Sequence, residues 1–144
     1  MKIVKDILEA KGYQVWSIHP DATVYDALTL MAEKNVGALV VVEGERPVGV
    51  ISERDYARNM ILKGRTSRDT AIREIMRPLA VTVRPEQDLE ECMELMTDKR
   101  VRHLPVMQGD KLIGMISIGD IVKGIISTKE FMIEQLEKYI KGHR

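Results

Sequence analysis

The feature that most constrains this chain is an internal repeat. When the sequence is shifted by 65 positions, residues 16–58 align without a gap with residues 81–123. Identical residues recur at equivalent places in the two copies, among them Gly44 and Gly109, Gly49 and Gly114, and Asp55 and Asp120. A repeat of this kind predicts a fold made of two similar units that pack on each other.

A short lead-in also precedes each copy. Residues 4–8 (Val-Lys-Asp-Ile-Leu) resemble residues 72–76 (Ile-Arg-Glu-Ile-Met), and the spacer that follows is three residues longer in the first copy. The repeated pattern therefore extends over nearly the whole chain.

Each copy has the pattern of a β-α-β-β-α unit. Thr23 with Asp26 three positions later marks a helix start, because such a pair forms a capping box. Asp88 and Glu91 mark the equivalent start in the second copy. Two apolar runs separated by a polar gap with a glycine follow in each copy and predict a hairpin, and a second helix comes after it. The expected strands are 16–18, 38–42 and 48–51 in the first copy, and 81–83, 104–107 and 112–116 in the second.

These patterns predict a fold class. One unit of about 45 residues has too small a core to be stable alone, whereas two units can bury their sheet faces against each other. We therefore expect an α+β fold of tandem β-α-β-β-α repeats packed with pseudo-twofold symmetry. Residues 1–65 would hold the first repeat with its lead-in, and residues 66–144 the second repeat with its lead-in and a C-terminal helix. That helix is expected over residues 128–140, where apolar residues have helical spacing, and it would end at Gly142.

Three motifs connect this pattern to a known family. They are Gly-Val-Ile-Ser-Glu-Arg-Asp at 49–55, Gly-Met-Ile-Ser-Ile-Gly-Asp at 114–120, and Arg-Val-Arg-His-Leu-Pro-Val at 100–106. The duplicated pattern resembles the CBS domain, named after cystathionine β-synthase. The first copy departs from the third motif, with Asn-Val-Gly-Ala-Leu-Val-Val at 35–41.

The resemblance implies a function as well as a fold. The chain is similar to small stand-alone CBS-pair proteins, in which two CBS motifs form a Bateman module that usually assembles into a homodimer. It implies a non-catalytic regulatory module that binds an adenosine nucleotide, first of all AMP, in the cleft between the repeats and signals to a protein partner. The alternative ligands are ADP, ATP, NAD and S-adenosylmethionine. A dimerisation module without a ligand is the second hypothesis.

Ser52 and Asp55 in the first copy, and Ser117 and Asp120 in the second, are the first candidate ligand contacts. Each pair lies where a strand leads into a helix, whose N-terminal N–H groups and dipole favour a phosphate. A carboxylate there can accept hydrogen bonds from both ribose hydroxyls. The alternative is that each Ser-x-x-Asp is a capping box that only starts its helix. The resemblance favours the ribose contact.

Arg102 and His103 are the next candidates. They replace Gly37 and Ala38 of the first copy at the entry to a strand that is otherwise apolar, so their side chains are expected to face a cleft or solvent. The resemblance implies that basic residues here reach a nucleotide phosphate, for which a guanidinium is well suited. The alternative is a surface ion pair with one of three acidic residues: Glu91, Glu94 or Asp98.

Other candidates suggest that the two clefts differ. Arg54 has Gly119 as its counterpart and either adds positive charge at one site or is solvated. Backbone groups at Gly37 and Ala38 are candidate contacts for an adenine edge, and Ser17 and Thr82 occupy the opening strands. We therefore expect one site to bind more tightly than the other. Residues 54–77 carry seven Lys and Arg against three Asp and Glu, a net charge of +4 that either attracts an anion or lies on a solvated helix and linker.

Composition and motifs exclude other classes. Lys plus Arg and Asp plus Glu both total 22, so the net charge is zero and no nucleic-acid binding is expected. The single cysteine, Cys92, and three histidines without ligand spacing predict no disulfide and no metal site. No catalytic or phosphate-loop motif is present, so we expect no enzyme activity and no required cofactor. No apolar stretch approaches the roughly 20 residues of a membrane span and no signal peptide is evident, which predicts a cytoplasmic protein.

Overall fold

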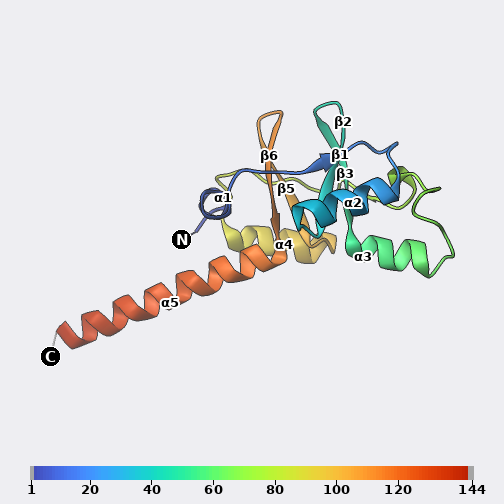
Figure 1. Ribbon diagram of the computed structural model, residues 1–144. Coiled ribbons are helices and arrows are strands. Elements are labelled where there is room, and N and C mark those ends of the chain that lie inside the picture. The colour runs from blue at the N-terminus through green and yellow to red at the C-terminus, as the bar shows by residue number, and fades with distance from the viewer. Residues whose placement is uncertain (1, 143–144) are drawn as a thin grey trace.

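The computed structural model describes residues 2–142 and gives both copies of the repeat a long helix, a hairpin and a final helix in the same order (Figure 1). The elements of the first half are α1 Val4–Lys11, β1 Ser17–Ile18, α2 Val24–Lys34, β2 Ala38–Glu43, β3 Arg46–Ser52, α3 Glu53–Tyr56 and the π-helical turn η1 Ala57–Ile61. Those of the second half are η2 Ile72–Glu74, β4 Arg77–Pro78, α4 Leu89–Lys99, β5 His103–Gln108, β6 Lys111–Ser117 and α5 Ile118–Gly142. The predicted α+β fold of paired repeats with a C-terminal helix is confirmed.

The strands form one sheet in each repeat. The first has the order β1-β2-β3-β4, with β1 parallel to β2 and the other pairs antiparallel. The second is the β5-β6 hairpin, where the strand predicted at 81–83 is reduced to a single parallel bridge between Val83 and Val106. In the first repeat the N–H of Val40 donates to the carbonyl of Trp16, but its counterpart in the second repeat is Pro105, which has no N–H. The second opening strand therefore lacks one of the bonds that extend the first.

Both predicted hairpins are present and have the same geometry. Their turns place Gly44 and Gly109 at φ of 62° and 61°, a conformation that favours glycine. Each hairpin also has a register shift at the same place, between Val41 and Val42 in one and between Val106 and Met107 in the other. The repeat in the sequence is thus a repeat in backbone geometry.

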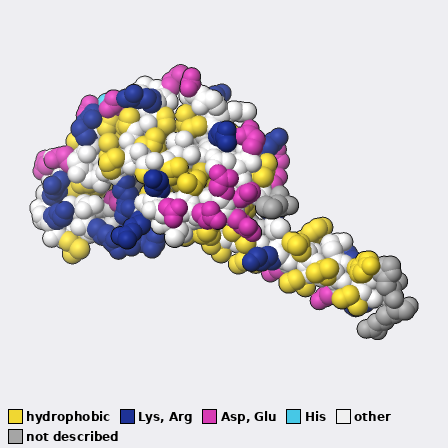
Figure 2. Space-filling model, turned by 180° about the vertical axis from the view of Figure 1, so that it is seen from behind, with side chains coloured by type: hydrophobic (Ala, Val, Ile, Leu, Met, Phe, Trp, Pro, Cys, Tyr) yellow, Lys and Arg dark blue, Asp and Glu magenta, His cyan; other side chains and the backbone are white. Residues whose placement is uncertain are grey.

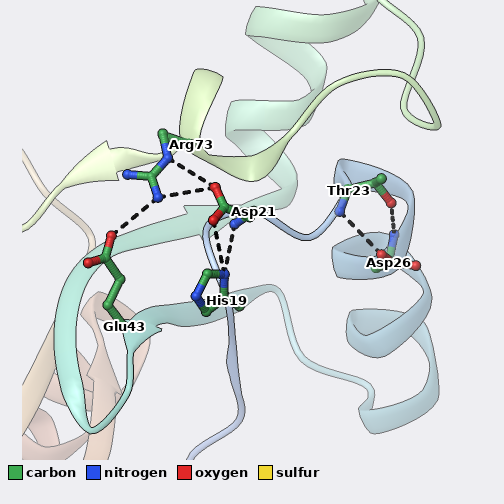
Figure 3. Close-up of polar contacts among 6 residues, drawn as sticks. All are labelled: His19, Asp21, Thr23, Asp26, Glu43 and Arg73. Atoms are coloured by element: carbon green, nitrogen blue, oxygen red, sulfur yellow. Dashed lines mark hydrogen bonds and ion pairs between the residues drawn. The ribbon is translucent and has the colours of Figure 1, made fainter.

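The first long helix of each repeat begins at the predicted cap. The N–H of Asp26 donates to Oγ1 of Thr23 at 3.1 Å, and the N–H of Thr23 donates to the Asp26 carboxylate at 3.2 Å (Figure 3). In α4 the N–H of Glu91 donates to Oδ1 of Asp88 at 2.7 Å, but the Glu91 carboxylate accepts from the side chain of Gln87 instead. The capping box is complete in α2 and half formed in α4.

Each repeat has its own hydrophobic core, and each core is completed by the lead-in of the other repeat. Val4, Ile7 and Leu8 of α1 are buried with side chains from α4, β5 and β6 of the second repeat. Ile72 and Ile75 of the second lead-in are buried with side chains from α2, β2 and β3 of the first repeat. The lead-ins are therefore exchanged between the halves.

Equivalent backbone bonds hold the two lead-ins in place. The N–H of Val4 donates to the carbonyl of Gln87, and the N–H of Ile72 donates to the carbonyl of Ala22, both at 2.9 Å. The predicted division of the chain between residues 65 and 66 groups each lead-in with the repeat that follows it in the sequence. In space, each lead-in packs on the other repeat. The two repeats cannot separate without opening both cores.

Arg73 adds a polar contact to the second lead-in. Its guanidinium donates from Nε and Nη2 to Oδ1 of Asp21 at 3.2 and 3.1 Å, and from Nη2 to Glu43 at 3.3 Å (Figure 3). The hydrogen bond to Asp21 is the main reason that the pKa of Arg73 is raised. Asp21 is itself oriented by its N–H, which donates to Nδ1 of His19 at 3.0 Å. This network fixes the second lead-in against the first repeat.

The last helices of the two repeats differ in length. In the first repeat α3 and η1 end at Ile61, and the chain turns at Gly64 with φ of 68°. In the second repeat the helix after Ser117 and the C-terminal helix predicted at 128–140 are one continuous helix, α5, which is 25 residues long and projects from the body of the molecule (Figure 1). No glycine with positive φ or proline interrupts it. Within residues 2–142, no helix combines the length and the apolar character that crossing a bilayer requires.

Candidate functional site

A cavity of about 660 Å³ lies where the two halves meet, and arginine dominates its wall. Arg54 and Arg58 come from the helix after β3, Arg77 from β4, and Arg100 and Arg102 from the loop between α4 and β5. Figure 2 shows Lys and Arg side chains gathered at the edge of the body opposite the projecting helix, the side on which α3 lies in Figure 1. Elements of both repeats therefore direct positive charge into one space.

Acidic side chains neutralise this cluster only in part, because Arg77 pairs with Asp55 at 3.1 Å, whereas the other four arginines form no ion pair within residues 2–142. Glu53 is the acidic residue among the described residues that line the cavity. Mutual repulsion lowers the pKa of Arg54, with the charge of Arg102 as the largest cause and that of Arg58 next. The predicted alternative for Arg102, an ion pair with an acid of α4, is wrong, because within residues 2–142 Arg102 forms no ion pair. Such a cluster attracts an anion with several charges.

Asp55, the first candidate ribose contact, is enclosed. Its Oδ2 accepts from the N–H and the Oγ of Ser52, both at 3.0 Å, and its Oδ1 accepts from Nε of Arg77 at 3.1 Å. The residue is 2% exposed. A small cavity of about 40 Å³ borders it and also touches the apolar residues 79–81. The capping box of Ser52 and Asp55 is formed, and both oxygens of this carboxylate already accept hydrogen bonds.

Asp120, the second candidate, is more accessible. Its Oδ2 accepts from the N–H of Ser117 at 2.9 Å and from Nζ of Lys11 at 2.8 Å, and its side chain is 26% exposed. Burial alone would raise the pKa of Asp120, but the hydrogen bond from Lys11 and those from Ser117 outweigh it and the pKa is lowered. Within residues 2–142, Oδ1 makes no hydrogen bond. The cap is formed here too, but one carboxylate oxygen remains available.

A second cavity of about 320 Å³ has both hydrogen-bond partners of Asp120 in its wall, Lys11 and Ser117, whereas Asp120 itself lines a neighbouring hollow that Lys11 also borders. The wall of this second cavity also includes Trp16, and Lys34 lies over the Trp16 ring at 4.4 Å from the ring centre. Gly37 and His103 line this cavity and the arginine-lined cavity as well. The two cavities thus lie on either side of the same residues.

His103 stands at this shared wall, at the start of β5. Burial is the main cause that lowers its pKa, and the positive charge of Lys11 is the next. Its imidazole is therefore neutral at pH 7, able to donate from one ring nitrogen and accept at the other. The lowered pKa displaces the titration of this side chain to more acidic pH.

The structure separates the remaining candidates. Gly37 and Ala38 line the cavity beside Trp16. Ser17 instead lines a third hollow of about 490 Å³, between the turns of the two hairpins. Thr82 borders none of these described cavities. The opening strands thus contribute less to the shared space than the sequence suggested.

Several cations at these cavities were not singled out by sequence reasoning, among them Arg58, Arg77, Arg100, Lys11 and Lys34. Arg58 and Arg77 fall within the positively charged segment 54–77, so the local charge was a usable signal for both. Arg100 opens the third motif and ends α4 at φ of 55°, which directs the following residues toward the cavity. Lys11 carried no signal, because it lies 109 positions from Asp120.

Comparison with known proteins agrees with this architecture. The CBS domain family matches residues 4–61 and again residues 72–127. The chain belongs to the CBS-domain family. The two matches coincide with the two repeats, each with its lead-in, so the tandem CBS pair inferred from the sequence motifs is confirmed.

CBS-domain proteins from several sources are similar to the chain. The mitochondrial CBS domain-containing protein CBSX3 of Arabidopsis thaliana is 41% identical over 149 aligned residues, which cover 96% of this chain and 72% of that protein. The structure of a protein with CBS domains from Burkholderia ambifaria MC40-6 superposes with a TM-score of 0.82 at 49% identity, covering 88% of this chain and 95% of that one. A CBS domain pair solved with 5′-methylthioadenosine and S-adenosyl-L-methionine shares the fold, with a TM-score of 0.76 at 21% identity over 89% of this chain and 98% of that one.

Proposed function

We propose that this CBS pair is a non-catalytic regulatory module that binds a phosphate-bearing adenosine nucleotide across the two joined cavities. The observation that carries the proposal is the set of five arginines that line one 660 Å³ space with Glu53 as the acidic residue of its wall. A guanidinium makes charge-assisted, bidentate bonds to phosphate, which makes a phosphate chain a fitting ligand for such a cluster.

The arrangement favours one orientation of the nucleotide. The adenine would lie in the cavity beside Trp16, with backbone groups of Gly37 and Ala38 at its edge. The ribose hydroxyls would donate to Asp120, and the phosphates would pass His103 into the arginine-lined cavity. Asp55 would contribute less, because both its oxygens are already bonded. This supports the expectation of one tighter site.

Charge also discriminates among the candidate ligands. The related CBS pair was solved with 5′-methylthioadenosine and S-adenosyl-L-methionine. Neither of those ligands carries a phosphate, and the sulfonium of the second is a cation. The four arginines without an acidic partner therefore favour AMP, ADP, ATP or NAD over both, and a longer phosphate chain over a shorter one.

Ligand binding would act through the exchanged lead-in. Lys11, at the end of α1, donates to Oδ2 of Asp120, while Leu8 of the same helix is buried in the second core. A nucleotide that competes with Lys11 for Asp120 would weaken this contact and so change which position of α1 is the most stable. A ligand shifts a conformational equilibrium through its different affinities for the two states, and a protein partner could read that shift. Assembly into a homodimer and a cytoplasmic location remain predictions, and the relative CBSX3 is mitochondrial.

Titration calorimetry with ATP, ADP, AMP, adenosine and S-adenosylmethionine tests the proposal. ATP should bind most tightly and adenosine most weakly. Asp120→Asn, which retains an oxygen for the helix cap, should weaken binding by about tenfold or more, since a hydrogen bond to a charged group contributes about 1.5–3 kcal/mol. Asp55→Asn should have a smaller effect. Arg102→Ala should weaken ATP binding more than AMP binding.

The matched control is Arg46→Ala, because Arg46 is an exposed arginine on β3 that lines none of these described cavities. Equal affinities for ATP and adenosine would refute the assignment of the arginines to phosphates. A thermal shift assay gives a second readout, with about 2.7 kcal/mol of stabilisation at a ligand concentration of about 100 times Kd.

The second candidate function is a dimerisation module that has no ligand. The observation in its favour is that both aspartates already serve as helix caps and as partners of Arg77 and Lys11. If neither the five compounds nor NAD binds or raises the melting temperature, the result favours this second function.

A further inference from the structure

The small cavity beside Asp55 is the counterpart, in the repeat, of the cavity beside Trp16. Three pairs of positions related by the 65-residue shift line them, with one member of each pair in each cavity: Ser52 and Ser117, Val101 and Val36, and Val81 and Trp16. The cavity beside Trp16 measures about 320 Å³, whereas the one beside Asp55 measures about 40 Å³, which has room for water but not for a nucleoside. The same place in the fold is therefore open in one half and closed in the other.

Arg77 stands between the small cavity and the arginine-lined cavity, since it lines both. Its Nε donates to Oδ1 of Asp55 at 3.1 Å, and its Nη1 donates to the carbonyl of Arg100 at 3.2 Å. In the part of the chain that the structure describes, its Nη2 makes no hydrogen bond. The side chain of Arg77 is 45% exposed and that of Asp55 is 3% exposed. The guanidinium thus covers a buried carboxylate and keeps one donor group for another partner.

Asp55 has other bonds that hold it in place. Its Oδ2 accepts from the N–H and the Oγ of Ser52, and neither bond involves Arg77. Without the guanidinium, Oδ1 would be a buried acceptor with no donor, which is unfavourable. The pair therefore opens at low cost only when both members find new partners, an anion for Arg77 and a hydroxyl donor for Asp55.

We propose that Arg77 is a latch that couples phosphate binding in the arginine-lined cavity to nucleoside binding beside Asp55. A guanidinium forms bidentate bonds to phosphate, so a phosphate group in that cavity draws Arg77 away from the carboxylate. The ribose hydroxyls of a nucleoside then donate to Asp55 in the enlarged small cavity. The backbone of Arg77 stays paired with Val50 of β3, so the movement is one of the side chain.

The latch rests on the proposed function, because it requires a phosphate in the arginine-lined cavity. Each ligand supplies a partner to the group that the other ligand leaves unpaired. The phosphate and the nucleoside should therefore raise each other's affinity by the same factor, and about tenfold lies within the usual range for coupled sites.

Inorganic tripolyphosphate and adenosine probe the two ends of the latch separately. The Asp120→Asn chain is used, since this change weakens the proposed ribose contact of the other site. In calorimetry, saturating tripolyphosphate should tighten adenosine binding by about tenfold. The chain has one tryptophan, Trp16, and it lines the other cavity, so adenosine bound beside Asp55 should leave its fluorescence unchanged.

Three additional changes in the same chain assign the effect to the latch. With Arg77→Ala, adenosine should bind tightly without tripolyphosphate, which should give no further gain. With Asp55→Asn, which retains an oxygen for the helix cap, tripolyphosphate should have no effect on adenosine, and this variant decides the matter if Arg77→Ala does not fold. The matched control is Arg58→Ala, because Arg58 lines the arginine-lined cavity and makes no bond to Asp55. It should bind tripolyphosphate more weakly but keep the full gain at saturation.

The outcomes separate this proposal from the proposed function. If tripolyphosphate binds and adenosine binding does not change, the latch is wrong and the phosphate site stands. If tripolyphosphate does not bind, both are wrong. A gain that persists with Arg77→Ala or Asp55→Asn, a gain that is lost with Arg58→Ala, or a gain that changes the Trp16 fluorescence would also overturn the latch.

Discussion

Replacing Leu8 by alanine should open the second repeat although Leu8 lies in the N-terminal lead-in. The side chain is fully buried in the core that contains Cys92. It packs so closely on β6 that a Cβ added at Gly114 would lie 2.7 Å from its Cδ2. The Leu8→Ala variant therefore tests whether the lead-ins are exchanged.

The expected magnitude follows from the burial. Truncating a fully buried leucine removes its transfer free energy and leaves a cavity, which together cost about 3 kcal/mol. A difference of about 1.4 kcal/mol is a tenfold change in an equilibrium constant, so the open fraction of this core should rise by about 100-fold. Cys92 reports that opening, because burial raises the pKa of its thiol to about 11 and keeps reagents away from it.

The assay is the rate at which a disulfide reagent labels Cys92 under native conditions. When opening and closing are fast, this rate follows the open population and should increase by about 100-fold in Leu8→Ala. The matched control is Ile72→Ala, which empties a similar volume from the other core and should accelerate labelling less. A wild-type rate in Leu8→Ala, or a faster rate in Ile72→Ala, would show that the lead-ins do not pack as described.

Three further variants test the packing and the electrostatics. Gly49→Ala should lower the free energy of unfolding, measured in urea, by about 1–3 kcal/mol, because the new Cβ would lie 2.6 Å from a backbone oxygen of β4. The control is Gly119→Ala, whose new Cβ would have its nearest contact at 3.6 Å, and this variant should change the free energy of unfolding little. The pKa of His103 is lowered in the fold, so the unfolded chain binds a proton at this side chain more readily than the folded chain does. The free energy of unfolding should therefore fall as the pH drops below about 6.5. In urea titrations from pH 8 to 5, His103→Gln should reduce this pH dependence, and an unchanged pH dependence would exclude His103 as its source. Lys11→Met should lower the free energy of unfolding by at most about 1 kcal/mol at pH 7, because it removes the ion pair with Asp120. This loss should disappear as the pH falls through the lowered pKa of Asp120, where the wild type loses the ion pair as well. A loss that persists at pH 2 would contradict the pairing.

Much of the fold could be predicted because its signals are local. The hairpins follow from apolar runs around Gly44 and Gly109, and the α2 helix starts where Thr23 and Asp26 form their box. Such features depend on residues within a few positions of each other. The basic side chains Arg102 and His103 were also expected at a cleft, because they interrupt the start of an apolar strand, and both line the arginine-lined cavity.

The same reasoning could not reach what depends on distant segments. The C-terminal helix was predicted over residues 128–140 as an element of its own, but it is continuous with the helix that begins after Ser117, and together they form α5. The opening strand near residue 82 was expected to match that near residue 17, but Pro105 removes a bond that only strand pairing reveals. In each case the outcome depends on what the segment meets in space.

The sequence by itself determined that the chain is a tandem pair of equivalent units, because gap-free duplication and apolar periodicity are properties of the sequence alone. Tertiary structure decided how the units differ and how they are joined. Whether a lead-in completes its own core or the other one depends on the spacer geometry and not on sequence proximity. The pairing of Asp55 with Arg77 and of Asp120 with Lys11, 22 and 109 positions apart, makes one carboxylate enclosed and the other accessible. Burial and charge pairing are set by neighbours in space, and those neighbours exist only after the two halves have packed.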